Sequence, residues 1–334
     1  MSIVSREWRL VARPAGEPKP SDFSLTPVEL ADLGPGQVLV RNDWMSVDPY
    51  MRGRMDDRPS YIPPFQLGEA MTGSAVGTVL ASRADAVPAG ATVLHFLGWR
   101  EYAVMDATMA RIIDTNLAPA QAYLGVLGTT GLTAWAGLTE IAPVQRGEVV
   151  FVSAAAGAVG SVAGQFARLL GASRVIGSAG GPEKASRVVA DYGFDVCLDY
   201  REGDIVGQLK AAAPDGIDVY FDNVGDDHLD AALRTMNNHG RVAMCGAISI
   251  YNATTPQPGP ASVWNAISKR LTLRGFIATD HLGLMPTFVP RAAGWLRDGS
   301  LRADETIVSG IENAVDAFSA MMRGANTGKM LVRL

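Results

Sequence analysis

The sequence predicts an α/β protein in which a doubly wound parallel sheet is combined with a second, mostly-β domain. Beyond about residue 124, short apolar runs alternate with segments of helical periodicity, which is typical of repeated β-α units. Before that point, short strand patterns are separated by Gly and Pro, and helical spacing is rare. A length of 334 residues suffices for two domains, each with its own core.

The expected elements follow from this alternation. Apolar runs predict strands over residues 37–41, 75–80, 92–96, 148–154, 174–177, 195–198, 217–222, 241–245, 271–276 and 305–308. Helical periodicity predicts helices at about residues 182–192, 204–213, 226–237, 261–269 and 286–297. Residues 22–36 are expected to form an extended loop, and the last residues a strand that returns to the first domain.

The stretch from Val149 to Gly171 predicts a buried strand, a turn of small residues and a helix. Within it, Ala155-x-Gly157-x-x-Gly160 matches the dinucleotide-binding fingerprint, with alanine at the first glycine position. Gly157 would let the backbone approach a pyrophosphate, and Gly160 would let the helix lie close to the strand. Small residues also form tight turns that bind nothing, but the β-α context places this turn on the first strand of a Rossmann sheet.

Composition limits the classes of partner. The net charge is −5 and the 29 Lys and Arg residues are scattered, which argues against nucleic-acid binding. No apolar run reaches membrane-spanning length, and the first residues lack a signal-peptide pattern, so we expect a cytoplasmic protein without a membrane partner.

Cysteine and histidine give no metal or disulfide pattern. Cys197 and Cys245 each lie in a predicted buried strand and are interpreted as small core residues. The four histidines, at positions 95, 228, 239 and 281, do not have metal-ligand spacing. No metal site is therefore expected.

The second strand of the Rossmann pattern indicates which dinucleotide binds. NAD sites place an acid at the end of this strand, whereas here the strand runs into Gly180-Gly181. Lys184 follows on the first turn of the next helix and could meet a ribose 2′-phosphate, although alone it would be interpreted as a solvated surface lysine. Tyr200, after the third strand, could flank the same phosphate or be an exposed loop residue. Together these features favour NADP(H).

Six stretches of the chain resemble the zinc-free medium-chain dehydrogenase/reductases, in the branch of the prostaglandin reductases, leukotriene hydroxydehydrogenases and alkenal or curcumin double-bond reductases. They are Met45–Arg52, Gly128–Ala134, Ala155–Gly160, Phe221–Gly225, Cys245–Asn252 and Gly328–Lys329. They run in family order from about residue 40 to the C-terminus. Each stretch alone is weak, but jointly they are specific.

The resemblance implies a GroES-like catalytic domain formed by residues 1–123 and 299–334, and a Rossmann domain formed by residues 124–298. It also implies NADPH in the cleft between them, and a homodimer. The implied cofactor-binding residues are Gly157, Ala158, Val159, Gly160, Lys184, Tyr200, Asn223, Cys245, Gly246, Ala247, Ile248, Ser249, Tyr251, Phe276, Ile277, Ala278 and Asn326. Tyr50 and Tyr251 would be catalytic and face the nicotinamide and the substrate.

Three stretches depart from the family pattern. Relatives commonly have Val-Gly-Gly after the residue that corresponds to Asn223, whereas here Gly225 is followed by Asp226. The turn at Gly128–Gly131 has Thr-Thr in the middle, where relatives often have Met and Pro. The stretch Phe96–Arg100, which varies among relatives, is expected to border the substrate.

The implied reaction is NADPH-dependent reduction of the C=C bond of an α,β-unsaturated ketone or aldehyde. A hydride reaches the β-carbon, and hydrogen bonds from Tyr251 and the nicotinamide ribose stabilise the enolate without a metal. Quinone reduction is the alternative activity, and a non-catalytic, crystallin-like NADPH-binding protein is the alternative outside enzymes. Zinc-dependent alcohol dehydrogenation is poorly supported, since residues 1–150 contain no Cys and one His. Without the resemblance, Tyr251 would be a packing residue of a Pro-rich loop and Tyr50 a domain-interface aromatic.

Overall fold

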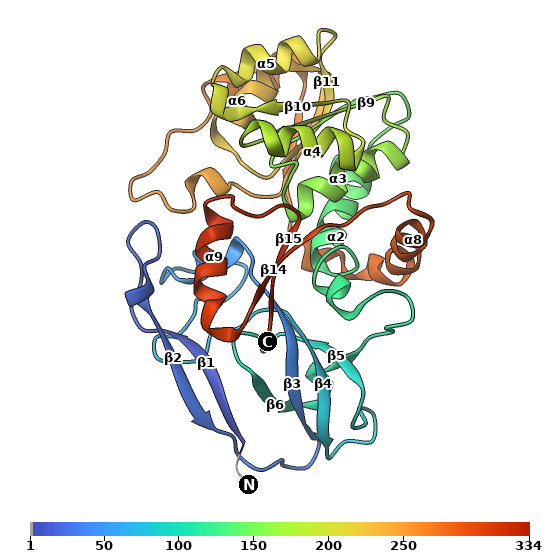
Figure 1. Cartoon of the computed structure of the whole chain (residues 1–334). Coiled ribbons are helices and arrows are strands. Elements are labelled where there is room, and N and C mark those ends of the chain that lie inside the picture. Colours follow the sequence, from blue (N-terminus) through green and yellow to red (C-terminus); the bar gives the residue numbers. More distant parts are fainter. Residues whose placement is uncertain (1–2) are drawn as a thin grey trace. The chain divides into compact units, whose positions relative to one another are not determined.

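The computed structural model describes residues 3–334 and divides the chain into two compact units (Figure 1). The first unit comprises the chain up to Leu124, Glu305–Ala325 and Met330–Leu334; the second comprises Gly125–Asp304 and Asn326–Lys329. Residues 299–304 and 326–329, which the sequence-based division places in the mostly-β domain, therefore lie in the second unit. The predicted fold class, a parallel α/β sheet plus a mostly-β domain, is confirmed.

The second unit is built on a six-stranded parallel sheet in the order β10-β9-β8-β11-β12-β13. Its strands are β8 (Val149–Val152), β9 (Arg174–Ala179), β10 (Val196–Asp199), β11 (Ile217–Asp222), β12 (Met236–Met244) and β13 (Thr272–Gly275). Counted from β8, this is the 3-2-1-4-5-6 order of dinucleotide-binding folds, in which the order reverses between β8 and β11. A ligand is therefore expected outside the carboxyl ends of these two strands.

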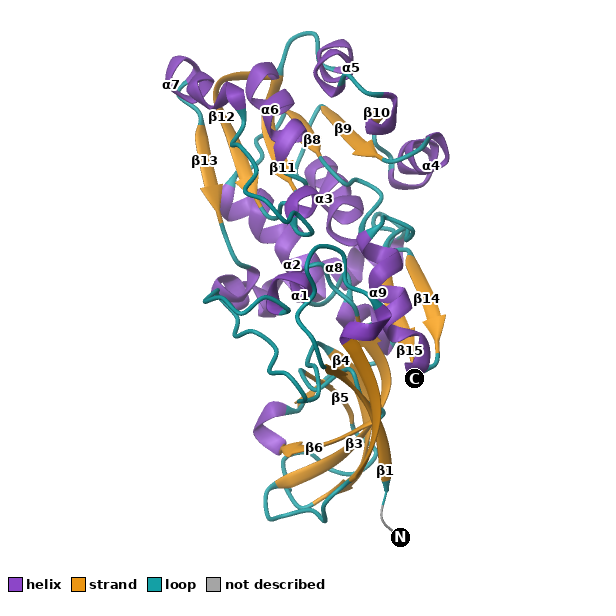
Figure 2. Ribbon diagram, turned by 90° about the vertical axis from the view of Figure 1, so that its left-hand side faces the viewer, coloured by secondary structure: helices purple, strands orange, loops and turns teal. Residues whose placement is uncertain are grey.

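Helices cover both faces of this sheet (Figure 2). They are α2 (Thr129–Ala136), α3 (Ala158–Leu169), α4 (Pro182–Tyr192), α5 (Ile205–Ala212), α6 (Asp226–Thr235), α7 (Asn265–Lys269) and α8 (Met285–Asp298). Tyr220 stacks on Phe151 at 4.9 Å, in a cluster shared with α5 and α6. Its neighbour Phe221 points to the opposite face and lies against Gly137 at the end of α2. Burial on both faces explains the continuous apolar pattern of the strands.

Three sequence-based assignments in this unit need correction. Helix α6 ends at Thr235 rather than 237, because Met236 adopts extended ψ (143°) and enters β12. The expected helix over 261–269 is a 3₁₀ turn, Ala261–Trp264, followed by α7. Cys245 lies directly after β12, which ends at Met244, since the N–H groups of Cys245 and Gly246 both donate to the carbonyl of Asp222 and the regular pairing stops there.

The first unit contains a seven-stranded sheet in the order β14-β15-β3-β4-β5-β7, with β6 also paired to β3. Its strands are β3 (Gln37–Ser46), β4 (Ala75–Ser82), β5 (Thr92–His95), β6 (Tyr102–Asp106), β7 (Arg111–Ile112), β14 (Glu305–Ser309) and β15 (Lys329–Arg333). Strand β15 pairs antiparallel with β3, so the last strand returns to the N-terminal part of the chain as predicted. The loop expected over 22–36 is instead partly strand, since β2 (Phe23–Glu29) pairs with β1 (Val4–Leu10).

Two helices complete the first unit, α1 (Tyr50–Arg54) and α9 (Ala314–Met322). The sequence pattern predicts no helix or strand over the α9 segment. In the structure, Phe318 of α9 is fully buried and packs edge-on against Trp99, with the ring centroids 6.4 Å apart. Within residues 3–334, none of the helices combines the length and apolar character that a membrane span requires.

Candidate active site

The turn between β8 and α3 has the geometry of an anion site. Gly160 packs so closely that a Cβ there would lie 2.3 Å from the carbonyl oxygen of Ala154, which only glycine avoids. Gly157 precedes α3, and in the described chain no side chain caps the helix at this end. The first N–H groups of Ala158, Val159 and Gly160 are thus available to an anion at the positive end of the helix dipole.

A buried carboxylate organises the carboxyl end of β11. Asp222 is 1% exposed, and one of its carboxylate oxygens accepts hydrogen bonds from the N–H groups of Val224 (3.0 Å) and Gly225 (2.8 Å) and from the hydroxyl of Tyr220 (2.7 Å). Burial raises the pKa of Asp222, and these hydrogen bonds oppose the rise. The Asp222 side chain therefore fixes the backbone at Val224 and Gly225, where the chain leaves β11.

Asn223 links this end of β11 to the neighbouring strand. Its side-chain amide donates to the carbonyl of Ser153 (2.8 Å), and its backbone N–H donates to the Ser153 hydroxyl (2.9 Å). Ser153 directly follows β8, so these bonds lie at the point where the strand order reverses. Asn223 is itself one of the predicted cofactor-binding residues. In the structure it also joins β8 and β11 through these two hydrogen bonds.

The loop after β12 carries Tyr251. The N–H groups of Cys245 and Gly246 donate to the carbonyl of Asp222, while Ser249 donates through its hydroxyl to the carbonyl of Val224 (2.5 Å). The loop then returns through the 3₁₀ turn η6 (Ile248–Ile250). The predicted residues 245–251 thus lie against the segment 222–225.

The phenol of Tyr251 is held by its own loop. Its hydroxyl oxygen accepts the N–H of Ala247 at 3.2 Å, which leaves the O–H proton free to be donated elsewhere. Burial raises the pKa of this hydroxyl, so it remains protonated at neutral pH. Tyr251 is therefore a neutral hydrogen-bond donor at the carboxyl end of the sheet.

Basic and aromatic side chains gather at the carboxyl ends of β9 and β10. Lys184 of α4 donates through Nζ to the carbonyl of Asn326 (2.6 Å), which brings two predicted residues together. Tyr200 begins the 3₁₀ turn η5 (Tyr200–Glu202), and its ring lies edge-on to His228 at 5.5 Å. Arg201, which the sequence analysis missed, comes next. A basic residue directly after Tyr200 is the only sequence signal that could have revealed it.

Residues 326–329 form a strap across the phosphate turn. The N–H of Gly328 donates to the carbonyl of Ala156 (2.8 Å), and Gly328 makes an isolated parallel bridge with Gly157. Gly328 has φ +66°, and a Cβ there would lie 1.9 Å from the carbonyl oxygen of Asp304. Glycine is therefore required for the strap to pass this point.

The predicted residues 276–278 follow β13. Phe276 lies edge-on to Phe221, with the ring centroids 6.3 Å apart, and its ring also lies near Gly137. Its side chain thus packs into the second unit, and Ala278 begins the 3₁₀ turn η8 (Ala278–Leu284). The ring of Phe276 has a packing role that the sequence analysis did not foresee.

Tyr50 lies in the first unit, at the start of α1. Its hydroxyl is buried, and burial together with the carboxylate of Asp48 raises the pKa well above its usual value, while Arg54 opposes this rise. The Arg54 guanidinium lies 4.0 Å from the ring centre of Phe65 and donates to the carbonyl of Pro63 (2.9 Å). Tyr50 is accordingly a protonated hydroxyl beside a buried cation.

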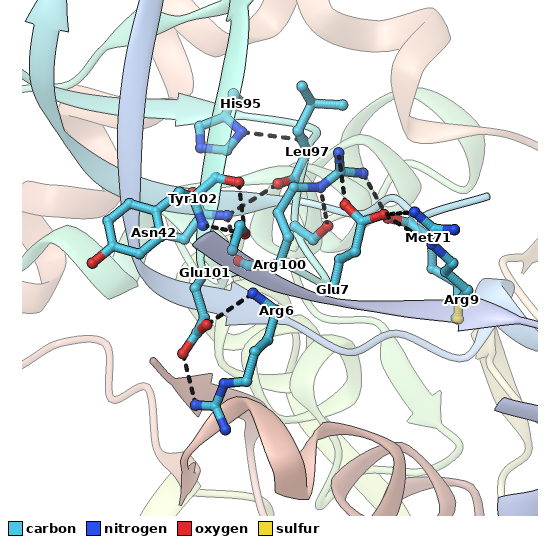
Figure 3. A network of polar contacts seen from close by, with 12 residues as sticks. Arg6, Glu7, Arg9, Asn42, Met71, His95, Leu97, Arg100, Glu101 and Tyr102 are labelled. Carbon is cyan, nitrogen blue, oxygen red and sulfur yellow. Dashed lines mark hydrogen bonds and ion pairs between the residues drawn. The ribbon is translucent and has the colours of Figure 1, made fainter. Parts of the chain in front are cut away.

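The stretch Phe96–Arg100, expected to border the substrate, is fixed by a polar network in the first unit (Figure 3). The side-chain amide of Asn42 donates to the carbonyls of Leu97 (3.0 Å) and Arg100 (2.8 Å). Trp99, between them, is fully buried with φ +63°, a strained conformation for a bulky residue. The network holds this strained turn in place and leaves Phe96 38% exposed.

Asp226 accounts for one departure from the family pattern. It adopts φ +46° at the first position of α6, directly after Gly225 at φ +76°. Glycine reaches this conformation without strain, so the glycine of the family pattern would fit this backbone. The departure changes the backbone at a helix start and adds an acid in the first turn of α6, where the helix dipole favours it.

Nowhere in residues 3–334 do three or more His, Cys, Asp or Glu gather as a metal site.

Comparisons with known proteins agree with this geometry. Two family profiles match, one described as the N-terminal domain of oxidoreductase over residues 6–113, the other as zinc-binding dehydrogenase over residues 158–293. The NADPH-dependent curcumin reductase of Escherichia coli is 40% identical over 336 residues, covering 99% of this chain and 97% of that protein. The NADP(+)-dependent 2-alkenal reductase of Nicotiana tabacum is 39% identical over 324 residues, covering 95% and 94%. The crystal structure of CurA from Vibrio vulnificus in complex with NADPH has a TM-score of 0.91 at 39% identity, covering 98% of each chain.

A parallel sheet in dinucleotide-binding order, with the fingerprint turn at its first strand and a mostly-β unit beside it in the chain, defines a two-domain dinucleotide-dependent oxidoreductase. The chain belongs to the medium-chain dehydrogenase/reductase family, in the branch of the alkenal, curcumin and prostaglandin reductases. The resemblance seen in the sequence is thereby confirmed.

Replacing His95 tests the network around Phe96–Arg100. His95 accepts the N–H of Leu97 through Nδ1 (3.1 Å), and burial, aided by the Arg100 charge, lowers its pKa to about 4. The unfolded chain therefore binds a proton that the folded protein rejects between about pH 6.5 and pH 4, so stability falls as the pH falls through this window. Once the pH is below about 4, the total loss of unfolding free energy from this histidine is on the order of 3 kcal/mol.

We expect His95→Asn, which keeps an acceptor for Leu97 but cannot titrate, to lose less stability than the wild type over this range. Urea unfolding at pH 7, 5.5 and 4.5 measures the difference, and His239→Asn, at an exposed position, is the control. Equal acid sensitivity of His95→Asn and the wild type would contradict the assignment.

Proposed function

We propose that this chain is an NADPH-dependent reductase of the C=C bond of α,β-unsaturated ketones and aldehydes. The observation that carries the proposal is Tyr251, a protonated hydroxyl fixed at the carboxyl end of the Rossmann sheet with its proton free to donate. The names of two relatives, a curcumin reductase and a 2-alkenal reductase, support the same substrate class.

The residues of the second unit suit NADPH. The turn Gly157–Gly160 offers backbone N–H groups for the pyrophosphate, and a Cβ in place of the Gly157 hydrogen would lie 3.2 Å from the carbonyl of Ala154. Lys184 and Tyr200 would hold the 2′-phosphate end, where β9 ends without an acid. Asn223, the loop 245–251 and the backbone of 276–278 would line the remainder.

Bound NADPH would supply the hydride that adds to the β-carbon of the substrate. Tyr251 donates a hydrogen bond to the substrate carbonyl oxygen, on which negative charge develops as the enolate forms. A donor that is already oriented by Ala247 needs little reorganisation to stabilise this charge. The α-carbon then receives a proton from Tyr251 or from water. Tyr50, also protonated, is proposed as the second catalytic hydroxyl.

Turnover with defined substrates tests the activity. We expect NADPH oxidation with an enone and an enal, with the saturated carbonyl compound as the product identified by mass spectrometry. Formation of a hydroquinone or semiquinone from a quinone, with no enone turnover, would indicate the quinone reductase alternative. NADPH binding without turnover of any substrate would indicate the non-catalytic alternative.

Removing the Tyr251 hydroxyl tests the proposed mechanism. We expect Tyr251→Phe to lower kcat with an enone about 10²- to 10³-fold, the usual cost of losing one oxyanion donor. The affinity for NADPH, followed by fluorescence titration, should change less than about twofold, because Tyr251 acts on the substrate oxygen. Tyr102→Phe, on strand β6, is the matched control. Wild-type turnover of Tyr251→Phe would remove this residue from the mechanism.

We also propose a cytosolic homodimer joined through the Rossmann sheets. Strand β13 is an edge of its sheet, and Trp264 and Ile267, shortly before it, are 73% and 72% exposed. A two-fold axis would pair the two β13 edges and cover these side chains in both copies. The free thiols of Cys197 and Cys245 suit a reducing compartment.

Charge at the proposed interface should separate the copies. We expect a dimer mass for the wild type in light scattering and a monomer mass for Trp264→Glu combined with Ile267→Glu, because two buried acids would oppose the interface. Ile307→Glu, at an exposed position of β14, should remain dimeric. A monomeric wild type, or a dimeric double variant, contradicts the proposed interface.

A further inference from the structure

Arg201 and Tyr200 lie over the glycines that follow β9. A Cβ at Gly180 would lie 2.6 Å from the hydroxyl of Tyr200 and 3.0 Å from Nε of Arg201. A Cβ at Gly181 would lie 3.6 Å from an Nη of Arg201. The guanidinium thus stands beside the loop that leads into α4, where the sequence analysis placed the 2′-phosphate.

Two cations share this place. Burial lowers the pKa of Lys184, and the positive charge of Arg201 lowers it further, in keeping with a guanidinium near the ammonium group. Proximity of like charges is unfavourable in the free protein and is relieved when an anion binds between them. The pair therefore favours a ligand that carries two negative charges.

The guanidinium of Arg201 is not neutralised within the part of the chain that the structure describes, since no carboxylate lies within ion-pair distance of it. Asp199, two residues before Arg201, uses one carboxylate oxygen to accept the backbone N–H groups of Gly181 (2.8 Å) and Arg201 (3.0 Å). Asp199 thereby fixes the loop and the start of η5 without pairing with the guanidinium. The donors of Arg201 remain available to a ligand.

We propose that Arg201 is a specificity-determining residue that binds the 2′-phosphate of NADPH together with Lys184 and Tyr200. This inference rests on the proposed cofactor. A planar guanidinium can donate two parallel hydrogen bonds to a phosphate, whereas Lys184 contributes a point charge that is already hydrogen-bonded to Asn326. NADH, which has a hydroxyl at this position, leaves both cations unneutralised and is disfavoured.

Binding of adenosine 2′,5′-bisphosphate tests the role of Arg201 without turnover. This probe has the 2′-phosphate but lacks the nicotinamide, and isothermal titration calorimetry measures its affinity for the full-length protein. We expect Arg201→Gln to weaken binding of the probe on the order of tenfold, and Arg201→Lys to restore part of the loss, because a charge without the fork remains. The affinity for NAD⁺ should change less than about twofold, because NAD⁺ has no 2′-phosphate.

Arg146→Gln is the matched control. It removes the same charge from an exposed arginine that precedes β8, at the opposite end of the strands, so it reports any effect of net charge alone. Raising the salt concentration should weaken binding of the probe more in the wild type than in Arg201→Gln, since one exposed charge contact is missing from the variant.

The outcomes separate this inference from the proposed cofactor. If Arg201→Gln binds the probe as tightly as Arg146→Gln while the wild type still prefers NADP⁺ over NAD⁺, the inference about Arg201 is overturned and the cofactor stands. If the wild type binds NAD⁺ as tightly as NADP⁺, the proposed cofactor itself is wrong. Loss of probe affinity in Arg201→Gln, with partial recovery in Arg201→Lys, supports the inference.

Discussion

The candidate site depends on the buried carboxylate of Asp222. One of its oxygens accepts hydrogen bonds from Tyr220, Val224 and Gly225 and a longer one from Ser153, and its backbone carbonyl accepts the N–H groups that begin the loop after β12. Through Tyr220 and Ser153 the same cluster reaches the end of β8. A carboxylate taken out of water is stable only when its hydrogen bonds are complete. The proposed pyrophosphate turn and the Tyr251 loop thus take their positions from one satisfied buried group.

Two kinds of positive charge lie at the carboxyl ends of the strands, and each suits a different part of the cofactor. Backbone N–H groups at the start of α3 offer weak, evenly spread positive charge, which suits the pyrophosphate of any dinucleotide. Side-chain cations after β9 and β10 offer localised charge, which suits one additional phosphate. Tyr251 adds a neutral donor, whose raised pKa prevents it from carrying charge of its own. In the proposed function, general binding, cofactor choice and oxyanion stabilisation are therefore assigned to different chemical groups.

The sequence predicted most of the second unit because local signals decide it. Apolar runs located the strands, and the small residues at 155–160 located the turn. Prediction from the sequence failed for residues whose role depends on contacts with residues far away in the chain. Helix α9 is defined by packing of Phe318 on Trp99, far away in the sequence, and Arg201 gains meaning only beside Gly180 and Lys184. Likewise, the conformation of Asp226 and the contact of Tyr251 with Ala247 depend on backbone geometry that cannot be predicted from the local sequence pattern.

The pairing of β15 with β3 has a consequence for how the chain folds during synthesis. Residues Trp44–Ser46 of β3 pair with Leu331–Arg333, and the whole segment Gly125–Asp304 is made between them. The second unit can therefore begin to fold while this edge of β3 still lacks its partner. An unpaired strand edge is a site of aggregation, and contacts between distant parts of a chain form slowly. The newly made protein should thus be most vulnerable after its Rossmann sheet has formed and before its last strand has joined the first unit.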